Sequence, residues 1–138
     1  MKRFGDQTRV LVLPVLALAI ISEMAPAMEV NPTLVDSMFQ HIRAETTWNI
    51  DGEMLWGYFF TAPDAAKLES VAQTLKARGY RVVEIYHSKG KYWLHVEKVE
   101  THSPNTLKTR NAELNALATR FQNVDYDGMD VGPVQASK

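Results

Sequence analysis

Residues 55–99, LWGYFFTAPDAAKLESVAQTLKARGYRVVEIYHSKGKYWLHVEKV, decide the fold of this chain. The stretch begins with an aromatic run over 55–61, which favours a β-strand because aromatic side chains pack well on a pleated surface. A helical pattern follows, and two further strand-like runs, 80–87 and 92–99, are joined by a short polar turn. A turn this short pairs its strands antiparallel. The stretch therefore predicts a strand–helix–strand–strand unit.

The helix of this unit has clear start and stop signals. Pro63 fits a first helical turn, and Asp64 places a negative charge at the positive end of the helix dipole. Gly79 is placed to end the helix, since glycine readily adopts the left-handed conformation found after many helices. The predicted apolar stripe has helical spacing and consists of Leu68, Val71, Ala72 and Leu75.

A shorter helix is predicted before the unit, over 32–44. Asn31 supplies a capping side chain, and Pro32 follows at the position where its missing N–H does no harm. A helix this short is not stable alone, so its apolar face must dock on the rest of the domain. The pair Asp51 and Gly52 favours a two-residue hairpin turn, and a plain loop into the main strand is the alternative.

One more helix and one more strand follow the unit. Ser103 and Pro104 open the helix with the same cap-then-proline pattern. Asn111 falls on its apolar stripe, and we expect this amide to find hydrogen-bond partners, because an unpaired buried amide costs about 1–3 kcal/mol. The final run, 126–134, alternates acidic and apolar residues as a half-exposed edge strand does, and Gly128 indicates a bulge or bend.

These elements together predict an α+β fold, a ferredoxin-like βαββαβ sandwich with an extra N-terminal helix. Two parallel strands joined by a helical crossover, with a third strand inserted between them, are typical of that arrangement. We therefore expect four antiparallel strands with two helices on one face. The chain divides into an N-terminal extension (1–27), a helix and connector (28–54), the folded domain (55–134) and a tail (135–138).

Alternation along the strands assigns side chains to the two faces of the sheet. The purely apolar set is expected to face the helices: Leu55, Gly57 and Phe59 on the first strand, and Tyr92, Leu94 and Val96 on the third. The mixed set is expected on the open face: Trp56, Tyr58, Phe60, Trp93, His95 and Glu97. An exposed face with this many aromatic residues is expected to be covered by another part of the protein or by a partner, and the N-terminal helix is the favoured cover. The expected partner-contacting residues are Trp56, Tyr58, Trp93, His95, Asp127 and Asp130.

Composition excludes several kinds of chemistry. The chain has no cysteine, so disulfides, thiolate metal sites and a cysteine nucleophile are excluded. Its formal charge is −1, and removing residues 1–27, with three basic and two acidic residues, leaves −2. A chain without clustered positive charge has no general attraction for phosphate polymers. Its expected partners are proteins, basic ones in particular.

No catalytic pattern stands out, and we predict a non-enzymatic protein without metal or cofactor. The four histidines do not have the spacing of metal ligands. His95 beside Glu97 could hold a metal ion or a proton, or could simply be a hydrogen-bonded histidine. The acids Asp125, Asp127 and Asp130 do not match a calcium loop. They form either a solvated edge or a docking surface for an arginine-rich segment.

A single-stranded RNA binder is one alternative function. Trp56, Tyr58 and Trp93 could stack bases, as aromatic residues on central strands do in RNA-binding sheets. The third strand, KYWLHV, lacks the glycine-aromatic consensus of those sheets, and the net charge has the wrong sign. Gel-shift affinity that depends on Trp93 would support this alternative.

Residues 1–27 have the shape of a secretory signal. Lys2, Arg3 and Arg9 precede an apolar run over 10–21, and the small residues at 25–27 form a possible cleavage point. The run is too short to span a bilayer as a helix. In the other interpretation Met28 is the true start. The first interpretation predicts an exported domain of unknown ligand and the second a cytoplasmic protein. In both, residues 1–27 are left out of the fold.

Three stretches together resemble the RraB family of inhibitors of the bacterial endoribonuclease RNase E. They are WGYFFTAPDAAKLESVAQTLKARGYRVVEIY, YWLHVEKVETHSP and YDGMDVGPV, within residues 56–134. The family often has an aromatic residue where Met129 stands. The resemblance implies a ferredoxin-like fold, a cytoplasmic location and binding to the Arg-rich, non-catalytic half of RNase E, which reduces its cleavage of transcripts. It also favours Met28 as the start.

Overall fold

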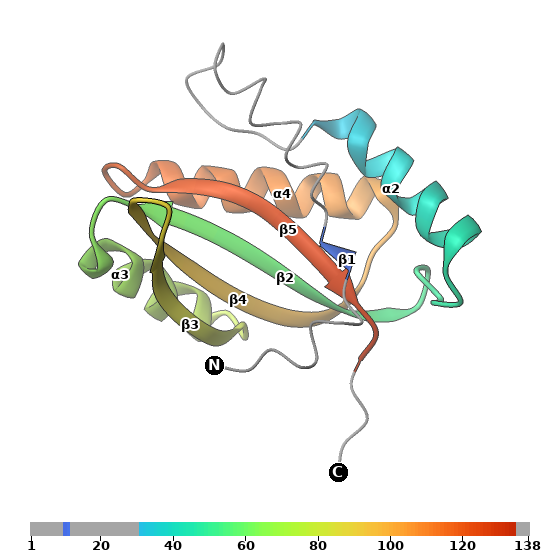
Figure 1. Ribbon diagram of the computed structural model, residues 1–138, viewed down its shortest axis with the longest axis horizontal. Coiled ribbons are helices and arrows are strands. Elements are labelled where there is room, and N and C mark those ends of the chain that lie inside the picture. The colour runs from blue at the N-terminus through green and yellow to red at the C-terminus, as the bar shows by residue number, and fades with distance from the viewer. Residues whose placement is uncertain (1–9, 12–30, 135–138) are drawn as a thin grey trace.

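The computed structural model describes residues 10–11 and 31–134 of the chain. Within these residues the strands form one antiparallel sheet in the order β1-β5-β2-β4-β3 (Figure 1). The strands are β1 (Val10–Leu11), β2 (Glu53–Ala62), β3 (Arg81–Ser88), β4 (Lys91–Thr101) and β5 (Asp125–Gly132). The helices are α2 (Pro32–Glu45), α3 (Ala65–Ala77) and α4 (Pro104–Thr119). The predicted α+β class is confirmed.

The central strand β2 pairs along its whole length with β4, from Glu53 opposite Thr101 to Ala62 opposite Tyr92. β4 separates β2 from β3, so the two strands that α3 connects are not neighbours. α3 packs on β3 and β4, and α4 packs on β5. The strand–helix–strand–strand unit predicted from residues 55–99 is therefore present, with the expected antiparallel turn between β3 and β4.

Local capping signals set the helix boundaries. Asn31 accepts a hydrogen bond from the backbone N–H of Thr33 at 2.9 Å, and Ser103 forms a capping box with Thr106. Asp64 is the cap of α3, so Pro63 lies before this helix and not in its first turn. Gly79 follows α3 with φ +92°, the left-handed conformation expected of it. Asp51 and Gly52 form a loop, so the plain-loop alternative is correct.

The prediction of a half-exposed edge strand at the C-terminus is wrong. β5 lies between β1 and β2, and it is mostly buried. β1 lies within residues 1–27, which were predicted to be outside the fold, yet Val10 and Leu11 pair with Val131 and Asp130. The other residues of 1–27 lie outside the described ones. The predicted bulge is present, because the β2–β5 register shifts and Gly128 has φ +127°.

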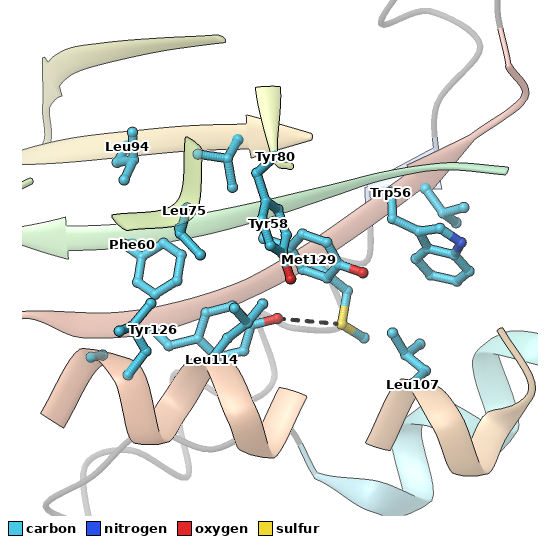
Figure 2. Packing of buried hydrophobic residues seen from close by; sticks show 14 of the residues in the cluster. Trp56, Tyr58, Phe60, Leu75, Tyr80, Leu94, Leu107, Leu114, Tyr126 and Met129 are labelled. Carbon is cyan, nitrogen blue, oxygen red and sulfur yellow. Dashed lines mark hydrogen bonds between the residues drawn. The ribbon is translucent and has the colours of Figure 1, made fainter. Parts of the chain in front are cut away.

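The assignment of the β2 side chains to the two faces is also wrong. Trp56, Tyr58 and Phe60 are fully buried against the helices (Figure 2). Tyr58 pairs with Val96, and Phe60 pairs with Leu94, so the aromatic set of β2 shares a face with the apolar set of β4. The physical reason is area: three large rings bury far more apolar surface than Leu55, Gly57 and Phe59 would. Trp56 and Trp93 consequently lie on opposite faces.

The N-terminal helix does cover Trp56, as expected, but on the same side as α3 and α4. The ring of Phe39 in α2 stacks on Trp56 with 6.2 Å between centroids. Asp36 of α2 forms an ion pair with Lys108 of α4 at 3.1 Å. Figure 1 shows α2 beside one end of α4. α2 therefore enlarges the core under the helices and is not a cover for the face that carries Trp93.

Candidate protein-binding surface

The sheet face turned away from α3 and α4 carries two cross-strand rows of polar residues. In the first row, Asp130 is opposite Gly57, Gly57 is opposite Glu97, and Glu97 is opposite Arg81. In the second row His95 lies between Phe59 and Glu84. We call this surface the charged face, and it comprises Arg81, Glu84, His95, Glu97 and Asp130.

Interactions within the charged face hold its side chains in place. A guanidinium nitrogen of Arg81 pairs with one carboxylate oxygen of Glu97. The Nε2 atom of His95 lies 3.7 Å from the other oxygen of Glu97, and its ring stacks on Phe59 with centroids 4.4 Å apart. Glu97 and Asp130 are only 5% and 6% exposed, whereas Arg81 is exposed. The face thus has recessed carboxylates beside an arginine at its margin.

The structure brings together three of the six residues expected to contact a partner. His95 and Asp130 belong to the charged face. Trp93 is two residues before His95 on β4, so its side chain lies on the same side of the sheet. The ring of Trp93 stacks on Tyr86, with 6.2 Å between centroids and 8° between planes. The Lys91 ammonium lies 5.2 Å from the Trp93 centroid. These half-buried aromatic residues border the charged face.

The other three expected residues have different surroundings. Trp56 and Tyr58 are fully buried on the helix side, so the expectation that they lie on an open surface is wrong. Asp127 lies in the β5 bulge and is half-buried. Burial raises the pKa of Asp127 to about 6, although the positive charges of Lys91 and Lys89 act in the opposite direction. This carboxylate is therefore more easily neutralised than an ordinary surface aspartate.

The helix side of the sheet carries a polar cluster that no sequence pattern predicted. Arg110 of α4 reaches Glu100 of β4 through Nη2 at 2.7 Å and Nε at 3.2 Å. The Nε2 atom of His102 lies 2.9 Å from the same carboxylate oxygen. Burial alone would raise the pKa of Glu100, but these hydrogen bonds outweigh it and hold the pKa below its ordinary value. Glu100, His102 and Arg110 lie within 10 positions of one another in the sequence, but their spacing does not match a known motif.

Neither a metal-binding cluster nor a membrane-spanning helix is found in the described part of the chain. No cluster of three or more His, Asp or Glu residues there could hold a metal ion. None of the helices that the structure describes is long and apolar enough to cross a membrane.

One family model matches the chain over residues 36–131, a range that starts within α2 and stops one residue before the end of β5. Its description is "RraB: Regulator of ribonuclease activity B". The chain belongs to the RraB family. The resemblance found in the sequence is therefore confirmed, and every residue of the charged face lies inside the matched range. No curated protein matches the chain. The RraB family name connects this fold to the regulation of a ribonuclease.

Proposed function

We propose that this protein is a non-enzymatic regulator that inhibits an RNase E-type endoribonuclease by binding its Arg-rich, non-catalytic region. Inhibition would slow RNA decay in the cytoplasm. We also assign the strand order β5-β2-β4-β3, with α3 and α4 on one face, to the ferredoxin-like βαββαβ arrangement, with α2 as the extra N-terminal helix. Membership of the RraB family supports the class of function.

The charged face is the observation that favours an arginine-rich partner. Asp130 and Glu97 flank Gly57 in one row, and Gly57 contributes no side chain between them. The Arg81–Glu97 pair is an example on this surface of a guanidinium bound to a recessed carboxylate. Guanidinium groups form strong, charge-assisted hydrogen bonds with carboxylates, so an acidic surface favours an arginine-rich partner. Glu84 is a half-buried carboxylate of the charged face, and Asp127 adds another at its border.

Electrostatics support the same choice of partner. The chain has a formal charge of −1, and its acidic residues on β5 are Asp125, Asp127 and Asp130. A basic segment approaching an anionic surface associates faster, and its affinity falls as salt screens the charges. Nucleic acid would be repelled by the same surface. The RNA-binding alternative also loses two of its three aromatic residues, because Trp56 and Tyr58 lie in the core.

The test compares two forms of the ribonuclease, with and without the Arg-rich region. We expect the full chain to bind the intact enzyme and slow its cleavage of a transcript, and to leave the truncated enzyme unaffected. Affinity should fall as salt rises from roughly 50 to roughly 200 mM. Calorimetry gives the binding, and gel analysis gives the cleavage rate. Equal inhibition of both enzymes, or no binding to either, would contradict the proposal.

A charge-matched pair of variants locates the contact. Asp127→Asn with Asp130→Asn removes two carboxylates at the charged face and its border, and should weaken binding by about tenfold. Glu45→Gln with Glu69→Gln removes two exposed carboxylates from α2 and α3, and should change binding less than about twofold. Circular dichroism checks that all variants fold. If both double variants bind equally, the partner contacts another surface.

A further inference from the structure

A cleft on the helix side of the sheet has the opposite charge to the charged face. It lies between the end of α3, strand β4 and helix α4, and its volume is about 390 Å³. Its lining is Arg78, Tyr80, Lys98, Arg110, Glu113, Leu114, Ala116, Leu117 and Arg120. We call it the basic cleft. Four of its lining residues are cations and one is an anion.

The single carboxylate of the basic cleft is already paired. Glu113 accepts a hydrogen bond from Arg110 at 2.5 Å, and Arg110 also binds Glu100. Within the described residues, the guanidinium groups of Arg78 and Arg120 have no ion pair or hydrogen bond. Both residues are exposed. The cleft therefore has a surplus of positive charge in a chain whose total charge is −1.

The apolar wall of the basic cleft suits an apolar side chain and not a nucleobase. Leu114 and Leu117 form an apolar wall on α4. The one aromatic ring, Tyr80, already has the Lys98 ammonium 4.6 Å and the Arg110 guanidinium 5.9 Å from its centroid. A base could not stack on a ring covered in this way. Single-stranded nucleic acid normally uses such stacking, so the cleft lacks a main feature of an RNA site.

We propose that the basic cleft binds a short acidic peptide segment that carries an apolar residue, from a protein partner. Arg110 and Arg120 are ten residues apart on α4, a distance of about 15 Å. An extended peptide covers that length with about four or five residues. This site goes beyond the proposed function, because it takes a ligand of the opposite charge on the opposite side of the sheet. The protein could then join an arginine-rich segment to an acidic one.

A purely structural role for the two arginines is the competing explanation. Arg78 and Arg120 are the C-terminal caps of α3 and α4, where positive charge stabilises the helix dipole. Lys76 is also in the last turn of α3 but does not line the cleft. A variant of Lys76 thus removes a similar contribution to the dipole and leaves the cleft intact. Binding and stability measurements together separate the two explanations.

The experiment titrates the full chain with three labelled probes. They are a five-residue peptide of glutamate and leucine, the same peptide with glutamine for glutamate, and a ten-residue polyuridine RNA. We expect the acidic peptide to bind at least about tenfold more tightly than either of the others. Amide shifts in a nitrogen-15 spectrum should concentrate at 78–80, 98 and 110–120. Preference for the RNA, equal binding of both peptides, or shifts elsewhere would overturn the proposal.

Variants complete the test. Arg78→Ala with Arg120→Ala should weaken binding of the acidic peptide by about tenfold or more. The matched control, Lys67→Ala with Lys76→Ala, removes two cations outside the cleft. It should change the affinity for the acidic peptide less than about twofold. Restoring charge with Arg78→Lys and Arg120→Lys should recover part of the affinity. If the control weakens binding as much as the cleft variant, the cleft is not the site.

Discussion

The hydroxyl of Tyr126 donates a 2.6 Å hydrogen bond to the side-chain oxygen of Asn111, joining β5 to α4 inside the core. Both residues are buried, and the Tyr126 ring also packs against Phe60. The same hydroxyl lies 4.0 Å from the sulfur of Met129, as the dashed line in Figure 2 shows. The oxygen of this amide on the apolar stripe of α4 thus has a partner, whereas its Nδ2 atom is buried without a hydrogen bond among the described residues. The bond fixes the last strand against the second long helix.

Removing this hydroxyl should destabilise the fold. Tyr126→Phe leaves the oxygen of Asn111 buried without its donor, which costs about 1–3 kcal/mol in the free energy of unfolding. Urea unfolding measures this value. Adding Asn111→Leu removes both polar partners, so it should recover part of the loss. Tyr92→Phe is the control, because the Tyr92 side chain is only half-buried and its hydroxyl has no hydrogen bond among the described residues.

Acid should weaken the fold through Glu100. Its pKa in the folded protein lies below the ordinary value of 4.5, so its stabilising contribution is complete above that value and disappears as pH falls through the lower folded pKa. We expect the free energy of unfolding to fall as the pH is lowered from about 5 to about 2, and to fall less steeply in Glu100→Gln. Urea unfolding across this range tests it. Glu113→Gln, which removes the half-exposed partner of Arg110, should keep the steep dependence.

Asp127 should have the opposite pH dependence. Its pKa is raised from 3.8 to about 6, so the folded state disfavours the charged form, and stability decreases as pH rises from the lower value through the higher. Asp127→Asn should therefore be more stable than the parent at about pH 7, by on the order of 1–3 kcal/mol, and similar to it at about pH 3. Glu53→Gln, which removes an exposed acid at the start of β2, is the control. A constant difference at all pH values would be evidence against this explanation.

The two tryptophans should differ strongly in what they contribute to stability. Trp56→Ala removes a fully buried ring that packs on Phe39 and His102, and should cost about 3–5 kcal/mol. Trp93→Ala removes a half-buried ring from the other face, and should cost no more than about 1–2 kcal/mol. Thermal and urea unfolding measure both. Similar losses for the two variants would mean that the faces are assigned incorrectly.

Local signals in the sequence predicted the helices of this fold. Asn31, Asp64 and Ser103 are caps because a side-chain oxygen needs only a backbone N–H two or three residues away. Gly79 ends α3 for an equally local reason, its positive φ. Such contacts depend on neighbours in the chain, so they can be read without any tertiary information.

The faces of the sheet could not be predicted in the same way. Alternation indicates that Trp56, Tyr58 and Phe60 share a face, and that Trp93, His95 and Glu97 share one. It does not indicate whether the two sets lie on the same side, because that depends on the register between β2 and β4. The pairing of Tyr58 with Val96 decides it. The position of β5, covered by β1, likewise depends on residues far away in the sequence.

The candidate binding surfaces, like the faces of the sheet, depend on contacts between residues far apart in the sequence. The sequence by itself determined that this chain is an α+β protein without cysteine chemistry, and it contained the motifs of the RraB family. Only the tertiary structure placed Asp130, Glu97 and Arg81 in one row, and Arg78 and Arg120 around one cleft. The physical reason is range: caps and turns are formed by residues within four positions, whereas charges that recognise a partner are gathered from strands and helices across the whole domain.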